Sequence, residues 1–117
     1  MSYKFRKEQR LKTLRRFQLV VKKGKIFRGK FLKIRILAED ESRRPVLGVK
    51  VTKKVDLRAV KRNVWKRRIK ESFRLLQNEI LPGRLILAEA VPQEKIPLFA
   101  EIKTEFEKLL REAQSLR

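Results

Sequence analysis

Residues 59 to 73, AVKRNVWKRRIKESF, combine dense positive charge with apolar residues at roughly helical spacing. The stretch holds six Lys or Arg residues and one Glu. On a helix over residues 57 to 78, these cations gather on one arc and the apolar side chains lie mostly opposite. Guanidinium and ammonium groups in such a row are suited to binding phosphate. The polar arc consists of Arg62, Asn63, Lys66, Arg67, Lys70 and Arg74.

The cations of this arc repel one another. Four of them follow at intervals of four residues, which costs the helix roughly 1 kcal/mol in total. Glu71 lies beside the row, so an external anion is the natural compensation. The alternative is a solvated charged face, but such faces normally mix signs. Lys53 and Lys54 stand just before the helix, and Asp56 is its predicted N-cap.

The charge of the whole chain points to the same kind of partner. The 117 residues contain 33 Lys plus Arg and 13 Asp plus Glu, a net charge of +20. Residues 1 to 88 carry 28 basic and 7 acidic side chains, whereas residues 89 to 117 carry 5 and 6. A localised excess of one sign predicts binding to a polyanion such as nucleic acid.

The composition excludes several kinds of catalytic site. Cys and His are absent, which removes disulfides, thiolate or imidazole metal sites and catalytic triads that use either residue. Asp40, Asp56 and scattered Glu residues form no convincing carboxylate cluster, so we expect neither catalytic nor metal-binding residues in the protein. No apolar run reaches membrane-spanning length, and we expect a cytoplasmic protein that does not bind membranes.

The remaining elements predict one domain over residues 1 to 117, with a basic arm at residues 1 to 12. A helix is expected over residues 13 to 23, ending at Gly24, followed by strands at 31 to 37, 46 to 52 and 84 to 90 and a last, structural helix. In FLKIRIL, alternation directs Leu32, Ile34 and Ile36 to the core. The opposite, basic face of the sheet would carry Phe31, Lys33, Arg35 and Lys50.

Two segments together resemble the protein component of bacterial ribonuclease P. TKKVDLRAVKRNVWKRRIKESFR resembles that family's signature of Ser or Thr, Lys-Lys, a spacer and an Arg-Asn-Arg core followed by further basic residues. RLKTLRRFQLVVKKGKIFRGKFL resembles its opening helix with an aromatic-Gln pair, a Lys-Gly stop and an Arg-Gly segment. The resemblance covers about residues 10 to 90, and the ordered combination is more specific than either segment alone.

The resemblance implies an α/β two-layer sandwich of order αβββαβα, similar to the ribosomal protein S5 domain 2-like fold, with a left-handed βαβ crossover. It also implies a protein subunit that pairs, 1:1, with a catalytic RNA. That RNA, with Mg²⁺ held mainly by the RNA itself, removes the 5′ leader from precursor tRNA by endonucleolytic cleavage. The protein would assist by binding both RNAs.

Site residues follow from the same resemblance. The catalytic RNA would be bound by Lys53, Lys54, Arg62, Asn63, Lys66, Arg67, Lys70 and Arg74. A cleft between the first helix and the sheet would bind the leader through Phe17, Val21, Phe31, Lys33, Arg35 and Lys50, with Phe17 as a stacking platform. Val64, Arg68, Val21 and Arg35 depart from the family pattern.

Alternatives stay open at this point. A structural ribosomal protein of similar α/β build would also be highly basic. A self-sufficient metal-dependent nuclease would need the carboxylate cluster that the sequence lacks. For single residues, core packing competes with stacking for Phe17 and Phe31, and Trp65 is expected in the core.

Overall fold

The computed structural model describes residues 14 to 117, so the predicted basic arm lies outside the described residues. The element order is αβββαβα, as expected. The bounds of the elements are α1 Leu14–Lys23, β1 Lys25–Arg28, β2 Leu32–Ala38, β3 Val46–Lys50, α2 Ala59–Leu76, β4 Arg84–Ala90 and α3 Phe99–Glu112.

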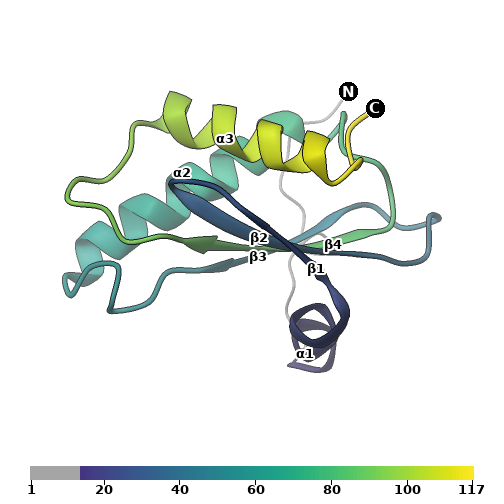
Figure 1. The fold of residues 1–117 in the computed structure, drawn as a ribbon, viewed down its shortest axis with the longest axis horizontal. Helices are drawn as coiled ribbons and strands as arrows, with labels where there is room; N and C mark the ends of the chain where they lie inside the picture. Colours follow the sequence, from purple (N-terminus) through teal and green to yellow (C-terminus); the bar gives the residue numbers. More distant parts are fainter. Residues whose placement is uncertain (1–13) are drawn as a thin grey trace.

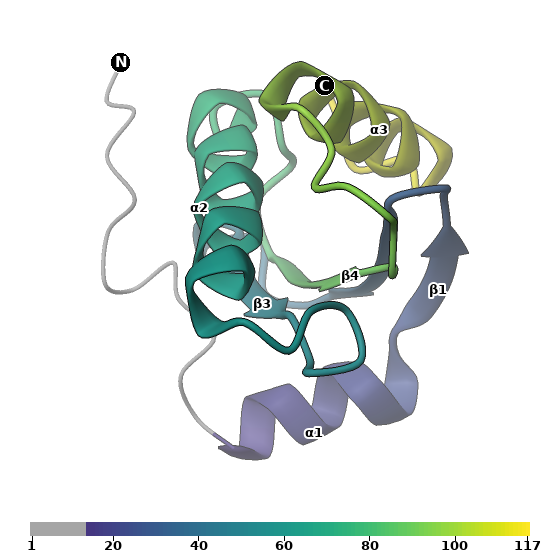
Figure 2. The same ribbon diagram turned by 90° about the vertical axis from the view of Figure 1, so that its left-hand side faces the viewer.

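The four strands form one mixed sheet in the order β1-β2-β4-β3. β1 with β2 and β2 with β4 are antiparallel, whereas β3 and β4 are parallel and are joined through α2. The left-handed sense of that crossover stays a prediction. Helices α2 and α3 cover one face of the sheet, and α1 lies on the other (Figures 1 and 2).

The main core lies between the sheet and the pair α2 and α3. Leu32, Ile34 and Ile36 of β2 are buried there, which confirms the alternation predicted for this strand. Trp65 is 2% exposed, as expected for a core residue. Further large side chains of this cluster include Ile69, Phe73, Ile102, Phe106, Leu109 and Leu110.

A smaller apolar cluster holds α1 against the second face. Val20 of α1 is fully buried with Val46, Leu85 and Leu87 of the sheet. Because α1 has only ten residues, it covers only part of this face. The strand residues that point to the same side beyond α1 are therefore available to form a site.

The start of α2 differs from the prediction. The helix begins at Ala59 with Arg58 as its N-cap, and no side chain caps it. Asp56 lies too early in the chain for that role, since its Oδ1 accepts a hydrogen bond from the Arg58 backbone N–H at 2.9 Å. Hydrogen bonds from the Arg58 guanidinium, together with this backbone bond, lower the pKa of Asp56.

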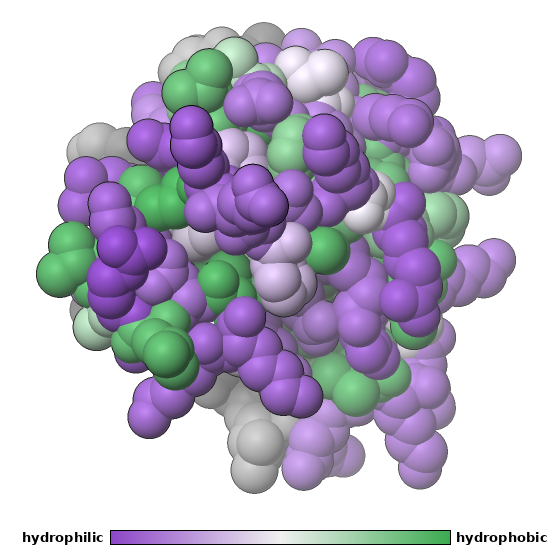
Figure 3. Space-filling model, turned by 60° about the vertical axis from the view of Figure 1, so that its left-hand side comes forward, coloured by the Kyte–Doolittle hydropathy of each residue, from purple (hydrophilic) through white to green (hydrophobic). Residues whose placement is uncertain are grey.

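Two features of the described residues bear on the classes of function considered above. None of the helices between residues 14 and 117 is long and apolar enough to cross a membrane. The same residues contain no group of three acidic side chains placed to hold a metal ion. The surface seen in Figure 3 is mostly hydrophilic, with scattered apolar side chains.

Candidate nucleic-acid interface

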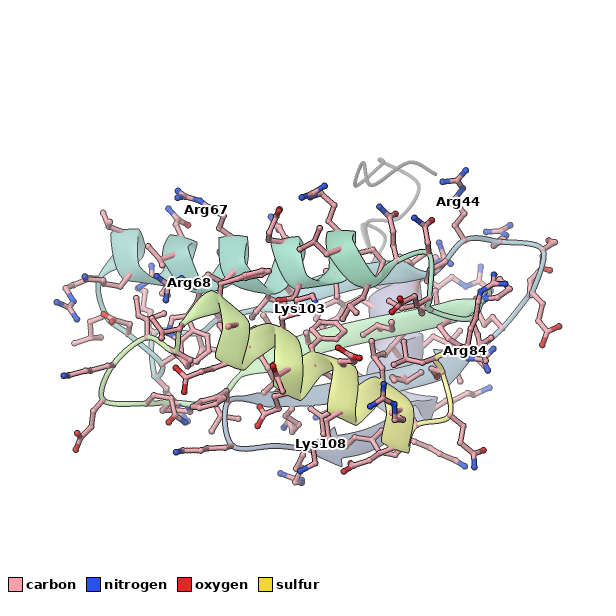
Figure 4. All side chains as sticks on the ribbon, turned by 90° about the horizontal axis from the view of Figure 1, so that it is seen from above. Arg44, Arg67, Arg68, Arg84, Lys103 and Lys108 are labelled. Carbon is pink, nitrogen blue, oxygen red and sulfur yellow. The ribbon has the colours of Figure 1, made fainter. Side chains whose placement is uncertain are left out.

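The outer face of α2 carries the predicted row of polar side chains. Asn63, Arg67 and Lys70 are exposed, and Arg62, Lys66 and Arg74 are half-buried. In Figure 4, Arg67 points away from α3 and Arg68 points toward it. This separation follows from the 100 degree rotation between consecutive helical residues. The row is therefore presented on the side of α2 that faces away from α3.

Glu71 relieves part of the repulsion, contrary to the expectation that it would lie off the row. The Arg74 Nε donates to Glu71 Oε2 at 3.0 Å, across one turn of the helix. This hydrogen bond lowers the pKa of Glu71 and raises that of Arg74. Arg74 therefore belongs to an ion pair within α2. The part of the row in which positive charge is not balanced by a neighbouring acid ends at Lys70.

Arg62 also has a role within the protein. Its Nη1 donates to the carbonyl oxygens of Asp56 at 3.0 Å and Leu57 at 2.9 Å. The side chain thus folds back over the segment that leads into α2. Arg62 keeps its positive charge, but much of its hydrogen-bonding capacity serves the start of the helix.

Five other cations form what we call the α2 cation patch: Lys53, Lys54, Lys66, Arg67 and Lys70. Across residues 14 to 117, none of them has a hydrogen bond or ion pair through its side chain. Lys53 and Lys54 are exposed in the turn before α2, where the Val55 N–H donates to the Thr52 carbonyl at 3.0 Å. The patch is positive, accessible and not neutralised by the part of the chain described.

Arg68, one of the departures from the family pattern, has a structural contact. Its Nη1 donates to the carbonyl oxygen of Pro97, in the segment before α3. The side chain therefore links α2 to that segment and leaves the outer row. Phe73, expected at the edge of the apolar arc, is fully buried, whereas Val60 in the first turn is 73% exposed.

The second face of the sheet carries most of the predicted cleft. Lys33 and Arg35 of β2 and Lys50 of β3 point to the side of α1. Arg35 is bound to α1, because its Nη1 donates to the carbonyl oxygen of Val21 at 3.2 Å. The Val21 side chain is 41% exposed beside it. Phe17 is half-buried against the small α1 cluster, so it packs in part as a core residue.

Phe31 was predicted on this face, and that prediction is wrong. It precedes β2 and packs against the main core on the opposite side of the sheet. There it lines a pocket with Ala100 and Thr104 of α3. The reason is a contact between distant parts of the chain: the Glu105 carboxylate accepts the Phe31 N–H at 2.7 Å and holds this segment against α3. Phe31 is therefore removed from the candidate cleft.

Sequence reasoning missed Glu89, an acidic side chain in the middle of the cleft face. Its Oε2 lies 3.1 Å from Lys33 Nζ, and its Oε1 lies 3.8 Å from Arg35 Nε. Two predicted cleft cations are thus partly neutralised. The pattern RLILAEA did contain the signal, since Glu89 is two residues from Leu87 and shares its face in a strand.

Strand β1 adds two further residues that were not predicted. Ile26 pairs with Arg35 and Arg28 pairs with Lys33, so both point toward the cleft face. Arg28 is exposed, and Ile26 is 42% exposed. They were missed because residues 25 to 28 were not recognised as a strand from their own pattern.

Comparisons with known proteins give a consistent result. The family model described as Ribonuclease P matches residues 5–114. The chain is 29% identical over 109 residues to the ribonuclease P protein component of a Pseudanabaena species, covering 93% of this chain and 94% of the relative. It is 35% identical over 108 residues to that of Clostridioides difficile, covering 92% and 93%.

A solved structure agrees with this similarity. The ribonuclease P protein of Staphylococcus aureus superposes with a TM-score of 0.83 at 29% identity, covering 95% of this chain and all of that one. The Thermotoga maritima protein superposes with a TM-score of 0.73 at 25% identity, covering 86% and 94%. The similarity thus extends over the α2 cation patch and the cleft face.

Proposed function

Because this chain belongs to the ribonuclease P protein family, we propose that its two cationic surfaces bind two different RNAs. The protein is an RNA-binding subunit of ribonuclease P, an endoribonuclease that acts in 5′ processing of tRNA. Family membership sets aside the ribosomal alternative. What remains to be assigned is which surface serves which RNA.

The α2 cation patch binds the catalytic RNA in this proposal. The observation that carries it is the absence of internal partners for Lys66, Arg67 and Lys70 among residues 14 to 117. Exposed cations of one sign gain most from a phosphate backbone, because each contact releases condensed counterions. Asn63, exposed beside them, adds an amide that can bind a base edge or a ribose hydroxyl.

The cleft beside α1 binds the single-stranded leader of precursor tRNA. Support comes from Lys33, Arg35 and Lys50 on one face, together with apolar surface from Val21 and Ile26. Single-stranded RNA binds to surfaces that combine positive charge with groups on which bases can stack. With Phe17 half-buried, its ring offers only part of its surface to a base.

Catalysis is assigned to the RNA subunit. Mg²⁺ needs several oxygen ligands, and no acidic group of three in the described part of the chain is placed to supply them. In this proposal the protein contributes binding and positioning. We expect no specific cleavage by the protein without RNA, and we expect it to act in the cytoplasm.

The test compares two triple variants with equal loss of charge. Lys66→Ala, Arg67→Ala and Lys70→Ala together should weaken binding to the cognate catalytic RNA. The slope of log Kd against log salt should fall by about 2 to 3, since three phosphate contacts are lost. Thermal melting should change little, because none of the three side chains makes an internal hydrogen bond or ion pair with residues 14 to 117.

The matched control is Lys95→Ala, Lys108→Ala and Arg117→Ala, which removes three exposed cations elsewhere. It should retain most of the affinity. Cleavage of precursor tRNA at low magnesium, with each protein added to the catalytic RNA, gives a second measurement. Equal losses in the two variants would mean that only total charge matters and would overturn the assignment of α2.

A further inference from the structure

One row of charged side chains crosses all four strands on the cleft face. Arg28 of β1 pairs with Lys33 of β2, Lys33 pairs with Glu89 of β4, and Glu89 pairs with Lys50 of β3. Directly paired residues of neighbouring strands point to the same side. The row therefore reads plus, plus, minus, plus over about 14 Å, given a strand spacing near 4.8 Å.

Glu89 has unused capacity to accept hydrogen bonds. One oxygen is held by Lys33, while the other faces Arg35 Nε at 3.8 Å, beyond hydrogen-bonding distance. That Nε is buried and has no hydrogen-bond partner. A carboxylate can accept about four hydrogen bonds, so further N–H donors can be accommodated at its exposed edge. The side chain is 15% exposed.

Glu89 is an acidic residue on a face whose other charged side chains are positive and suited to binding a polyanion. Arg28, Lys33, Arg35 and Lys50 outweigh one Glu, so the face attracts phosphates overall. Near Glu89 itself a phosphate is repelled, whereas a group that donates N–H is attracted. Phosphates therefore favour the two ends of the row, and the position between them favours a base.

Nucleobases differ in what they present to a carboxylate. Cytosine carries an amino donor at N4, whereas uracil, of nearly the same shape, carries an acceptor oxygen at that position. A carboxylate binds the first and repels the second. A hydrogen bond to a charged acceptor is also stronger than one between neutral groups.

We propose that Glu89 is a specificity-determining residue that accepts a hydrogen bond from the exocyclic amino group of a leader base, while Arg28 and Lys50 contact the flanking phosphates. This inference rests on the proposed binding of the leader in the cleft. It adds β1 to the leader site and predicts that the protein distinguishes bases with an amino group from uracil at one position.

The experiment uses the holoenzyme and precursor tRNAs whose leaders differ by a single C→U change at successive positions. The wild-type protein should bind the cytosine leader about tenfold more tightly at one position. Glu89→Gln should abolish this preference at that position, because an amide can both donate and accept. Glu94→Gln, which removes an exposed acid from the loop after β4, should preserve it.

Three results would overturn the proposal. The wild-type protein could bind cytosine and uracil leaders equally at every position. Glu89→Gln could tighten both leaders equally, as expected if Glu89 only neutralises cations. The preference could instead be lost when the 2′-hydroxyl of that leader nucleotide is removed, which would assign the contact to the ribose.

Two further measurements keep these outcomes separable. Arg28→Gln and Lys50→Gln should weaken the binding of both the cytosine and the uracil leader without changing the ratio of the two affinities. These variants test the roles of the flanking cations even if Glu89→Gln folds poorly. A change in that ratio would count against the assignment of phosphates to these residues. Equal affinity for leader-bearing and leaderless tRNA would overturn the proposed leader site itself, whereas a leader effect without base preference would overturn only the role of Glu89.

Discussion

Glu105 connects a helix to a loop far away in the sequence. From α3 its carboxylate accepts the backbone N–H groups of Lys30, Phe31 and Leu32, each at 2.7 Å. A β-carbon on Gly29 would lie 2.4 Å from Glu105 Cδ, so a larger residue there would force the carboxylate to shift. One acidic side chain thus satisfies three backbone donors. The contact fixes the entry to β2 and the side on which Phe31 packs.

Removing this carboxylate should destabilise the fold. Glu105→Ala leaves three backbone donors without their acceptor, and we expect the free energy of unfolding to fall by about 2 to 4 kcal/mol. Chemical denaturation measures this loss. The control Glu112→Ala removes an exposed acid from the end of the same helix and should change stability by less than about 0.5 kcal/mol. Similar losses in both variants would contradict the role of Glu105.

At the scale of single residues, the sequence predicted surface cations better than their partners. Lys66, Arg67 and Lys70 were found from helical periodicity, because the face of α2 on which a side chain lies follows from local geometry. The contacts of Glu89 and Glu105 depend on which strands and helices become neighbours, and a single sequence does not specify that. The face of Phe31 was missed for the same reason, since α3 lies more than 70 positions away.

At the scale of elements, α2 combines a helix start without a side-chain cap and a repulsive outer face. Arg62 adds positive charge to the repulsive face. It also stabilises the start of the helix, because it donates hydrogen bonds to the carbonyl oxygens of Asp56 and Leu57. Lys66, one turn later, contributes charge and has no such bond within the described structure. The two residues thus affect helix stability in opposite directions.

This difference gives a prediction for two single variants. Arg62→Ala should lower the free energy of unfolding by about 1 kcal/mol, because two hydrogen bonds are lost. Lys66→Ala should leave it unchanged or raise it by a few tenths of a kcal/mol, since a like-charge pair is removed. Melting curves at low salt compare them directly. A larger loss for Lys66→Ala than for Arg62→Ala would show that the repulsion argument fails.

Most elements were predictable from their own residues, and the exceptions are instructive. The alternation of β2 and the stripe of α3 predicted their buried faces because each pattern extends over several residues. The four residues of β1 are too few for periodicity, and that strand was expected only from the family resemblance. Asp56 was placed as the cap of α2 because acceptors are common there, but the chain forms a turn first.

At the scale of the molecule, the positive charge is poorly balanced within the fold. The sequence has a net charge of +20, and the known ion pairs are mostly at the surface. Surface pairs contribute little to stability, whereas repulsion among many like charges extends over the whole protein at low salt. The free protein is therefore expected to be less stable than its packing alone would allow.

Salt should therefore act in opposite directions on stability and binding. Raising ionic strength from about 0.01 M to 0.15 M shortens the screening length from about 30 Å to 8 Å. The melting temperature of the free protein should rise, while its affinity for RNA falls. The variant lacking Lys66, Arg67 and Lys70 should gain less from salt. A melting temperature that falls with salt would mean that the ion pairs outweigh the repulsion.

Strand β4 lies in the interior of the sheet, bonded to β2 on one side and β3 on the other, yet it is the last strand in the sequence. During translation, β2 and β3 emerge first and have no direct partnership with each other. The sheet cannot be completed until residues 84 to 90 have left the ribosome. Until then the nascent chain exposes the edges of β2 and β3 that β4 will later pair, and its strong positive charge helps to keep such chains apart.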